Sequence, residues 1–532
     1  MKRLLFIFCA LWCIAIHGQE MVELSGLWEC SVGDSLNYKD FVELPGVHQN
    51  QGETWYKKSV YIPQSWKNLR VTIFLERPYH ETTIFVNGEK VMRQMSLWTP
   101  HQCDVTRWLK PGQRNTIVVC VSNGSEKLNG IAGRMELRAQ LRELYIEKVR
   151  IRPDLSNGCV HLSLDAGGPF SWDRFQDYNN FYTIAVVKDG DDPSKAIVRH
   201  RYVTEPHIDY DFHFIDSVYL WDEFHPNLYR IGISLANDYY ETTFGMYDIA
   251  AYDRQLYINE HPMILRGTVE NHFPLDSDCP MDEDEWETIF SQYKEYGLNH
   301  VRFQSYCPPE VAFHVADRFG LYLQVELPSG SVEESKRIID TYGHHPSFVM
   351  VSSKVKSNSD WEQTMKKYDP TKIYDLELPM IASGESYKQS IEENMRTEDC
   401  MGFLLQSFDD VSKKMPATDW VEFCSPVVVL AKFPKTIYSN KDTLVVPVEV
   451  CNAMYGSLMN VRQSYYLTDA EQHVLAGGLL SSGDIPTGKN INIGTVSFPL
   501  DKISEPAKLT LTVSIGGQFK NHWDFWVRPE EE

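Results

Sequence analysis

Between residues 252 and 425 the sequence alternates short apolar runs with longer amphipathic stretches. This alternation constrains the fold more than any other feature, because strands that are each followed by a helix pair in parallel, in an open sheet or a barrel. We therefore expect a parallel sheet here, rolled into a (β/α) barrel. The predicted strands are MILRG (263–267), NHVRF (299–303), LYLQVEL (321–327) and SFVMVS (347–352), and the predicted helices are 282–297, 308–320 and 332–343.

The sequence on both sides of this region predicts β-sandwiches. Residues 20–145 and 145–247 consist of short runs rich in β-branched and aromatic residues, separated by turn signals such as the hairpin turn Asn87-Gly88. From about residue 426 the chain returns to runs of the same kind. The expected fold class is thus multidomain, β plus α/β.

The first eighteen residues predict a signal peptide. Lys2 and Arg3 precede an apolar run that is too short to span a bilayer, and Gly18-Gln19 follows it. A lipoprotein leader with Cys13 as the acylated residue is the weaker alternative, because Trp12 stands where a small residue is expected. We expect a secreted or periplasmic protein that is not held in a membrane after cleavage, since no later run of eighteen apolar residues exists.

Charge and cysteine spacing exclude several classes of partner. A formal charge of −22 repels nucleic acid. The nine cysteines after residue 18 are an odd number without close pairs, which predicts neither a disulfide framework nor a zinc site. His344 and His345 have no acidic residue at a spacing typical of a metal site, so we expect turn residues there. No metal or cofactor is predicted.

Eight sequence pieces, in order, resemble glycoside hydrolase family 2, which contains the β-galactosidases and β-glucuronidases. They are TWYKKSVYIPQSW, VNGEKV, TPHQCDVTRWLKPGQRNTIVV, NGIAGRMEL, LWDEFHPNLYRI, INEHPMILRGTVENHFPLD, KEYGLNHVRFQSYCPPEVAFHVADRFGLYLQVELP and DFWVRP. The resemblance covers nearly the whole chain after the leader. It implies a signal peptide (1–18), a sugar-binding jelly roll (19–144), an immunoglobulin-like β-sandwich (145–250), a catalytic-type barrel (251–425) and a C-terminal β-sandwich (426–532).

The family hydrolyses terminal β-glycosides with retention, which needs one carboxyl group as acid/base and a second as nucleophile. In the family the acid/base Glu follows an Asn at the end of the fourth strand, after an HPS start. Without gaps, these two positions fall on Val355 and Lys356. An amine with a pKa near 10 is a poor proton donor, so Lys356 predicts impaired catalysis.

Two other positions depart from the family pattern. The RFHSW pattern after the second strand reads RFQSY here, so a sugar-contacting His has become Gln304. The nucleophile should close the seventh strand, where Gly384 takes the strict position. Glu385 lies one residue later and is the candidate nucleophile, with an exposed loop acid as the alternative.

The predicted barrel is also short, because residues 252–425 are far fewer than the roughly 250 of a complete (β/α)₈ barrel. YDPTKIYD (368–375) resembles the family's fifth strand region, and LPMIA (378–382), which resembles the seventh, follows almost at once. We therefore expect the sixth strand and its helices to be missing between Tyr374 and Pro379.

Three polar residues lie at the ends of predicted strands and are candidates for substrate binding: Arg266, Arg302 and Glu326. An Arg–Glu network that braces the sheet end is the alternative. We expect Lys356 beside Arg302 and Glu326 at the mouth of the barrel. Two functions follow: a catalytically impaired relative that binds a glycan or oligosaccharide, and an active exo-β-glycosidase with a rearranged site.

Overall fold

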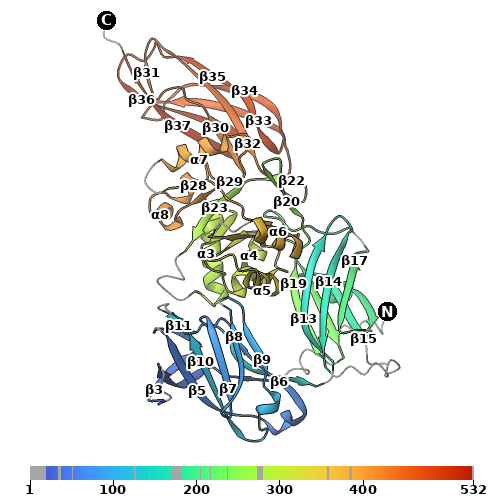
Figure 1. Ribbon diagram of the computed structural model, residues 1–532. Coiled ribbons are helices and arrows are strands. Elements are labelled where there is room, and N and C mark those ends of the chain that lie inside the picture. Colours follow the sequence, from blue (N-terminus) through green and yellow to red (C-terminus); the bar gives the residue numbers. More distant parts are fainter. Residues whose placement is uncertain are drawn as a thin grey trace.

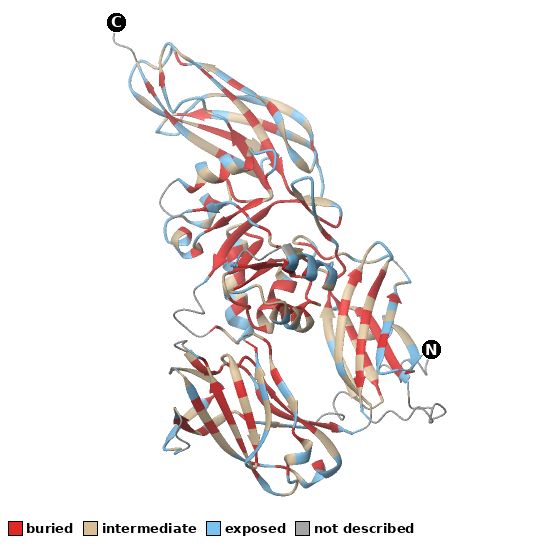
Figure 2. Cartoon of the chain, viewed as in Figure 1, coloured by how far each residue is buried: buried red, intermediate tan, exposed pale blue. Residues whose placement is uncertain are grey.

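Three β-sandwiches surround a central parallel sheet (Figure 1). The computed structural model describes residues 20–529 except 34–36, 51, 97, 125–127, 143, 169–180, 204, 216, 237, 272–278, 356–358 and 383–385. The predicted leader, residues 1–18, lies outside this part. Figure 2 shows the buried residues alternating with exposed ones along the sandwich strands, whereas the central strands β23 to β26 and β29 are buried throughout.

The N-terminal sandwich has a six-stranded sheet in the order β3-β2-β5-β10-β7-β8 and a four-stranded sheet in the order β1-β12-β6-β9, with the pair β11-β4 beside them. Its core holds the fully buried Trp28, Tyr56 and Trp66. The strands are β1 (Glu20–Glu23), β2 (Gly26–Val32), β3 (Asp40–Leu44), β4 (Gly46–Gln49), β5 (Glu53–Tyr61), β6 (Leu69–Leu75), β7 (Glu81–Val86), β8 (Glu89–Met95), β9 (His101–Asp104), β10 (Arg114–Ser122), β11 (Leu128–Ile131) and β12 (Met135–Leu141).

The second sandwich packs a three-stranded sheet, β13-β14-β17, on a four-stranded sheet, β16-β15-β18-β19. A small antiparallel sheet, β20-β21-β22, leads from it into the barrel. The strands are β13 (Tyr145–Asp154), β14 (Cys159–Gly167), β15 (Phe181–Lys188), β16 (Ile197–Tyr202), β17 (His207–His213), β18 (Tyr229–Leu235), β19 (Asp238–Phe244), β20 (Ile249–Tyr252), β21 (Gln255–Ile258) and β22 (His261–Met263).

The C-terminal sandwich is formed by the sheets β30-β32-β35 and β31-β37-β36-β33-β34. Its core is almost purely aliphatic, with Val446, Val448, Val450, Leu509 and Leu511 fully buried. The strands are β30 (Val427–Ala431), β31 (Ile437–Ser439), β32 (Thr443–Asn452), β33 (Leu458–Thr468), β34 (Val474–Ile485), β35 (Gly488–Pro499), β36 (Ala507–Ile515) and β37 (Phe519–Arg528).

The central sheet has seven parallel strands in the order β27-β26-β25-β24-β23-β29-β28. This order is that of a (β/α) barrel in which the last strand pairs with the first. The strands are β23 (Leu265–Glu270), β24 (His300–Phe303), β25 (Tyr322–Leu327), β26 (Phe348–Ser353), β27 (Ile373–Tyr374), β28 (Met380–Ile381) and β29 (Gly402–Leu405). The helices are α3 (Glu283–Glu295), α4 (Glu310–Phe319), α5 (Val332–Tyr342), α6 (Ser359–Tyr368), α7 (Tyr387–Met395), α8 (Phe408–Ser412) and α9 (Ala417–Trp420).

The barrel is incomplete, as the length of the segment predicted. β27 and β28 form the two ends of the sheet, and only residues 375–379 join them. Leu376 and Leu378 of this link are buried in the same apolar cluster as Leu265, Tyr322 and Leu404 from three barrel strands. The link therefore fills the interior where a sixth strand would stand. The predicted fold class, with its truncated barrel, is confirmed.

Local signals in the sequence explain where the barrel helices begin and end. Asp282 caps α3 by accepting a hydrogen bond from the Asp284 amide, and Ser331 caps α5 through the Glu334 amide. Gly320 ends α4 in the left-handed conformation, with φ of 63°. A Cβ at Gly320 would lie 2.8 Å from the Glu223 Cα, so glycine also permits the close approach of the loop between β17 and β18 of the second sandwich.

Candidate functional site

The C-terminal ends of the barrel strands bring together three charged side chains. Arg302 is the third residue of β24, and Glu326 is the fifth residue of β25. Their neighbours Val301, Phe303, Val325 and Leu327 pack in the core shared with the helices, so the two charged side chains face the other way, into the barrel. Glu377, from the link between β27 and β28, reaches the same place.

A single guanidinium holds both carboxylates. Arg302 Nε donates to Glu326 Oε2 at 3.0 Å, its Nη2 donates to the same oxygen, and its Nη1 donates to Glu377 Oε2 at 3.1 Å. The side chains of Arg302 and Glu326 are only 9% and 2% exposed, whereas that of Glu377 is 59% exposed. Arg302 and Glu326 thus form a buried ion pair, and Glu377 forms its solvent-exposed extension.

The turn after β24 adds polar groups to this network. Ser305, in the left-handed region with φ of 64°, donates from its Oγ to Glu326 Oε1 at 3.3 Å. Gln304 accepts at Oε1 from Asn271 Nδ2, 3.3 Å away, and its amide donates to the Glu270 carbonyl. Gln304 therefore lies at the mouth, as expected, but bridges the turns after β23 and β24.

Sequence reasoning found Arg302, Glu326 and Gln304 but missed Glu377. The residue follows no strand, and its link takes the place of a whole strand and its helix, so no spacing rule points to it. The segment between Tyr374 and Pro379, where a strand was predicted to be missing, contains Glu377. An acidic residue in that segment is the signal that would have identified it as a site residue.

The predicted catalytic positions Lys356 and Glu385 lie outside the described residues, as does Gly384. The chain next to them follows the expected course: β26 ends at Ser353, and Val355, which is 58% exposed, accepts a hydrogen bond from Ser353 Oγ. The expected proximity of Lys356 to Arg302 and Glu326, and the roles of Lys356 and Glu385, stay predictions.

The structure does not support the predicted sugar contact of Arg266. Arg266 is the second residue of β23 instead of one at its C-terminal end, so it lies near the N-terminal end of the sheet, opposite the mouth. Its guanidinium is buried and donates to the Gly297 carbonyl at 2.7 Å and to Glu223 Oε1 at 2.7 Å. This is the bracing network that was the alternative, and it fixes the second sandwich beneath the barrel.

The interior below the mouth is filled by side chains and leaves His300 buried. Gln324 of β25 donates from Nε2 to Ser352 Oγ and to the Leu376 carbonyl, which fixes the link inside the barrel. Burial, with the Arg302 guanidinium adding to it, lowers the pKa of His300 to about 3. His300 is thus a neutral core residue at physiological pH.

A cleft lies between the N-terminal sandwich and the barrel. This cleft has a volume of about 630 Å³, within the range of ligand sites. Its polar lining is mostly acidic, and Arg134 is bound to Glu76 at 2.7 Å. The lining residues include Met21, Glu23, Glu76, Arg134, Glu136, Met281, Glu310 and His314.

Four groups of side chains in the described residues bring potential metal-ligand atoms within 4.8 Å of one another. Two of them share His345 and lie beside α4, and the other two lie on the second and the C-terminal sandwich. The groups are Glu310, His344 and His345; His314, Asp317 and His345; Asp154, Cys159 and His161; and Asp469, Glu471 and His473.

The nine cysteines of the described residues are free thiols, and eight of them are buried. Burial raises the pKa of Cys103 and Cys120 to about 12, so these thiols stay protonated and unreactive at physiological pH. Within the same part of the chain, no helix is long and apolar enough to cross a membrane.

Comparison with known families gives two matches along the chain. The family "Glycosyl hydrolases family 2, sugar binding domain" matches residues 12–131, which include most of the N-terminal sandwich. A domain of unknown function (DUF8488) matches residues 442–529, in the C-terminal sandwich.

Among curated proteins, this chain is similar to a β-galactosidase of Leuconostoc mesenteroides, with 22% identity over 352 residues. That match covers 62% of this chain and 33% of the relative. A β-glucuronidase of Streptococcus agalactiae is 20% identical over 347 residues, covering 58% of this chain and 57% of the relative. The chain thus spans less than two thirds of these relatives.

Solved structures share the fold. A β-D-mannosidase of Dictyoglomus thermophilum has a TM-score of 0.73 at 12% identity and covers 95% of this chain and 89% of its own. A β-glucuronidase of Bacteroides uniformis has a TM-score of 0.60 at 13% identity and covers 96% of this chain and 80% of its own. At such identities the likeness shows the fold alone.

Proposed function

The chain belongs to glycoside hydrolase family 2, and from this premise we propose that it is a glycan-binding member whose hydrolytic activity is impaired or lost. It is a β-glycosidase-like protein of carbohydrate metabolism. One observation carries the proposal: Arg302 binds both Glu326 and Glu377, two carboxylates at the mouth.

Retaining hydrolysis needs two carboxyl groups about 5–5.5 Å apart, one of which carries a proton for the leaving group. Glu326 is buried, accepts from two guanidinium nitrogens and receives a third hydrogen bond from Ser305. A carboxylate held in this way has both oxygens occupied by donors of this protein, so neither is free to meet the leaving group of a substrate. Loss of general acid catalysis reduces the rate by about 10²- to 10⁴-fold.

The open side of the barrel supports the same proposal. In the family pattern the nucleophile closes the seventh strand, which here is β28, only Met380–Ile381. Because a (β/α) barrel takes its catalytic groups from the ends of several strands, the loss of the sixth strand removes one of those positions. Lys356, at the acid/base position that the family resemblance implies, is a second departure from the family pattern.

The second candidate function is an active exo-β-glycosidase with a rearranged site. The exposure of Glu377 favours it, because a carboxyl group that is 59% exposed at the mouth is accessible to a substrate. Glu385 would then be the candidate nucleophile. We further propose secretion or periplasmic export through residues 1–18, and an oligosaccharide with a terminal β-linked sugar as the ligand.

The test is a screen of the purified protein for both binding and cleavage. Binding of plant-type oligosaccharides is measured by calorimetry, and cleavage is measured with activated aryl β-glycosides and with natural disaccharides. The variants are Lys356→Glu and Glu377→Gln. Glu398→Gln is the matched control, because this exposed acid precedes β29 and so lies at the opposite end of the barrel.

The expected result is saturable oligosaccharide binding, with turnover of natural β-glycosides below about 10⁻³ of an active relative. Turnover of aryl glycosides alone would support a lost acid with a surviving nucleophile, because such leaving groups depart without protonation, and Glu385→Gln would then be tested. Efficient cleavage of natural disaccharides by the wild type would overturn the proposal. If Glu377→Gln but not Glu398→Gln then abolished cleavage, the second candidate would stand.

A further inference from the structure

Three histidines and two acids gather on the outer side of the barrel, away from the mouth network. Glu310, His314 and Asp317 lie on α4, spaced four and three residues apart, so they share one side of the helix. His344 and His345 come from the turn between α5 and β26. The His344 and His345 ring centroids are 4.2 Å apart, and those of His314 and His345 are 4.7 Å apart.

His345 is held in the manner of a metal ligand. Its Nδ1 hydrogen-bonds Asp317 Oδ2 at 2.6 Å, and Asp317 in turn accepts from the Ser347 amide at 2.9 Å. Its ring is fully buried and stacks on Phe313. Histidines that bind metals use one ring nitrogen for the ion and donate the other to a carboxylate in this way.

One ring nitrogen of His344 and one of His345 have no hydrogen-bond partner within the described part of the chain. His344 Nε2 and His345 Nε2 are both buried without a hydrogen bond. A buried polar atom left unpaired costs about 1–3 kcal/mol, so two of them on adjacent residues need a physical explanation. A bound cation would supply the missing partner for both.

The three histidines are in the protonation state that binds a metal ion. Burial lowers the pKa of His314, His344 and His345, which keeps the imidazoles neutral and their lone pairs free. Burial also raises the pKa of Glu310, with Glu76 adding to it and Arg134 opposing it. A cation beside Glu310 would reverse that effect and favour the carboxylate.

We propose that Glu310, His344 and His345 bind a divalent transition-metal ion of the zinc type. One ligand atom from each of the three already lies within 4.8 Å of the others. Ligand atoms about 2.0–2.1 Å from a tetrahedral ion lie roughly 3.3 Å apart, so a separation of up to 4.8 Å has to shorten by at most about 1.5 Å on binding. Asp317 orients His345, and the ion joins α4 to the turn before β26.

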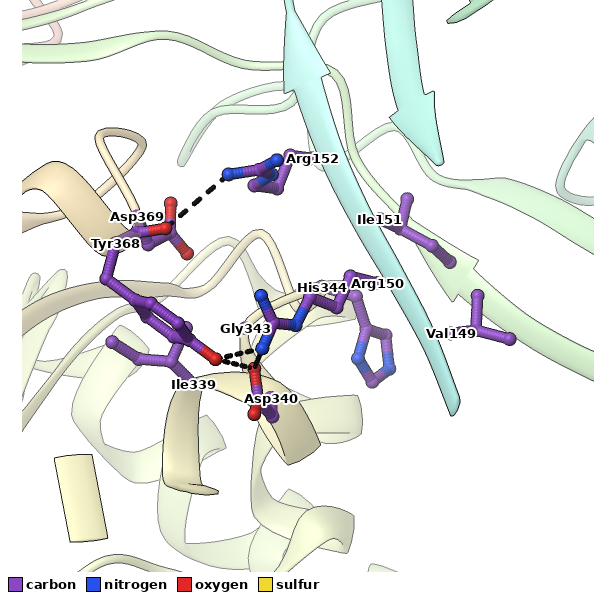
Figure 3. A pocket seen from close by; sticks show the side chains of 10 residues that line it. All are labelled: Val149, Arg150, Ile151, Arg152, Ile339, Asp340, Gly343, His344, Tyr368 and Asp369. Carbon is purple, nitrogen blue, oxygen red and sulfur yellow. Dashed lines mark hydrogen bonds and ion pairs between the residues drawn. The ribbon is translucent and has the colours of Figure 1, made fainter. Parts of the chain in front are cut away.

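The site also has paths for entry. Glu310 and His314 line the cleft between the N-terminal sandwich and the barrel. On the other side, His344 lines the small pocket between the second sandwich and the barrel, where Arg150, Asp340 and Tyr368 bind one another (Figure 3). The expectation from sequence that His344 and His345 have no acidic partner is corrected, because α4 supplies two.

The other metal-type groups do not share these properties. Both ring nitrogens of His161 already have partners, Asp211 at 2.5 Å and Asp154 at 2.9 Å. His473 is exposed and hydrogen-bonded to Asp469. These two histidines therefore serve as matched controls.

The test measures Zn²⁺ binding to the EDTA-treated full-length protein by calorimetry, with Co²⁺ absorption as a second readout of tetrahedral ligation. The variants His344→Asn and Glu310→Gln remove ligands at partly exposed positions, so the fold is retained. We expect one equivalent of Zn²⁺ with a rise in Tm in the wild type. We expect a loss of affinity of at least ten- to a hundredfold in each variant and no change in His161→Gln or His473→Gln.

Two results would overturn the proposal. The first is wild-type protein that binds no Zn²⁺ above the level of the His344→Asn variant. The second is binding that survives both ligand substitutions or disappears in His473→Gln, which would place the ion on a sandwich surface. If His344→Asn lowers Tm without Zn²⁺, the Glu310→Gln variant and the Co²⁺ spectrum still decide the outcome.

Discussion

The two halves of the barrel are built differently. From β23 to β26 the strands have four to six residues each, and each of the four is followed by a helix of ten to thirteen residues. From β27 to β28 the strands shrink to two residues each, and the link 375–379 replaces a strand and its helices. The first half is a regular (β/α) array, and the second half is a partial one.

The difference teaches that packing and catalysis make separate demands on a barrel. Packing is satisfied without the sixth strand, because Leu376 and Leu378 fill the interior and Gln324 binds the Leu376 carbonyl. Catalysis is not satisfied as easily, because it needs carboxyl groups at set strand ends on both sides of the ring. In this chain Glu326 and Glu377, two of the carboxylates at the mouth, are both bound by one arginine of the regular half.

The largest effect is expected from Arg302→Met. Removing this cation leaves Glu326 buried and unpaired, which should lower the free energy of unfolding of the barrel by about 3–5 kcal/mol. Hydrogen exchange of peptides from β24 and β25 measures the change within the barrel, separately from the sandwiches. Arg254→Met is the control, because its pair with Asp399 is exposed, and no measurable loss is expected. A loss equal to the control's would show that the mouth network is not buried in solution.

The next effect is expected from the link. Leu376→Ala should lower the free energy of unfolding by about 2–3 kcal/mol, the low end for a buried leucine, because a small fraction of the side chain is exposed. Leu475→Ala, at an exposed position of β34, is the matched control and should cost less than about 0.5 kcal/mol. Urea denaturation of both variants, with exchange of the β27 and β28 peptides, checks this. Equal values would mean that the link does not close the barrel interior.

Lowering the pH should destabilise the regular half of the barrel, because His300 is buried there in its neutral form. Its folded-state pKa of about 3 lies below the unfolded value of 6.5, so the unfolded chain takes up a proton first and stability falls as the pH drops from 6.5 towards 3. At pH 5 this histidine should cost about 2 kcal/mol relative to pH 7. Exchange rates of the β24 peptide in wild type and His300→Asn at both pH values measure it, and the variant should lose less.

His161→Gln is the control for that experiment. The hydrogen bond with Asp211 raises the pKa of His161, so this histidine adds stability at low pH and loses that effect as the pH rises through its folded pKa. Its replacement should change the pH dependence in the opposite sense. The same slope in His300→Asn and wild type would contradict the role of His300.

The smallest effect is expected from Glu377→Gln. Its side chain is mostly exposed and pairs with Arg302 through one hydrogen bond, so its loss should cost roughly 0–1 kcal/mol. Thermal unfolding checks this value. A cost above about 2 kcal/mol would mean that the link depends on this ion pair more than on its leucines.

The sequence by itself determined the order of the four folded regions, the parallel pairing of the central strands and the place of the missing one. The order and the pairing follow from periodicity, and the shortness of the barrel follows from length; the place of the missing strand followed from the resemblance of residues 368–375 and 378–382 to the fifth and seventh strands of the family. It also placed Arg302 and Glu326 together, because residues at the ends of neighbouring parallel strands lie side by side.

Only the tertiary structure decided the rest, because contacts between residues far apart in sequence have no local signature. In the structure Arg266 lies at the end of the barrel opposite the mouth, where it forms an ion pair with Glu223 from the loop between β17 and β18. Glu377 binds Arg302 although the two residues are 75 positions apart in the sequence. Asp317 likewise binds His345, which is 28 positions away. A buried imidazole needs a hydrogen-bond partner, and the residues next to His345 in sequence do not supply one. The tertiary contact with α4 is therefore what makes His344 and His345 a candidate metal site.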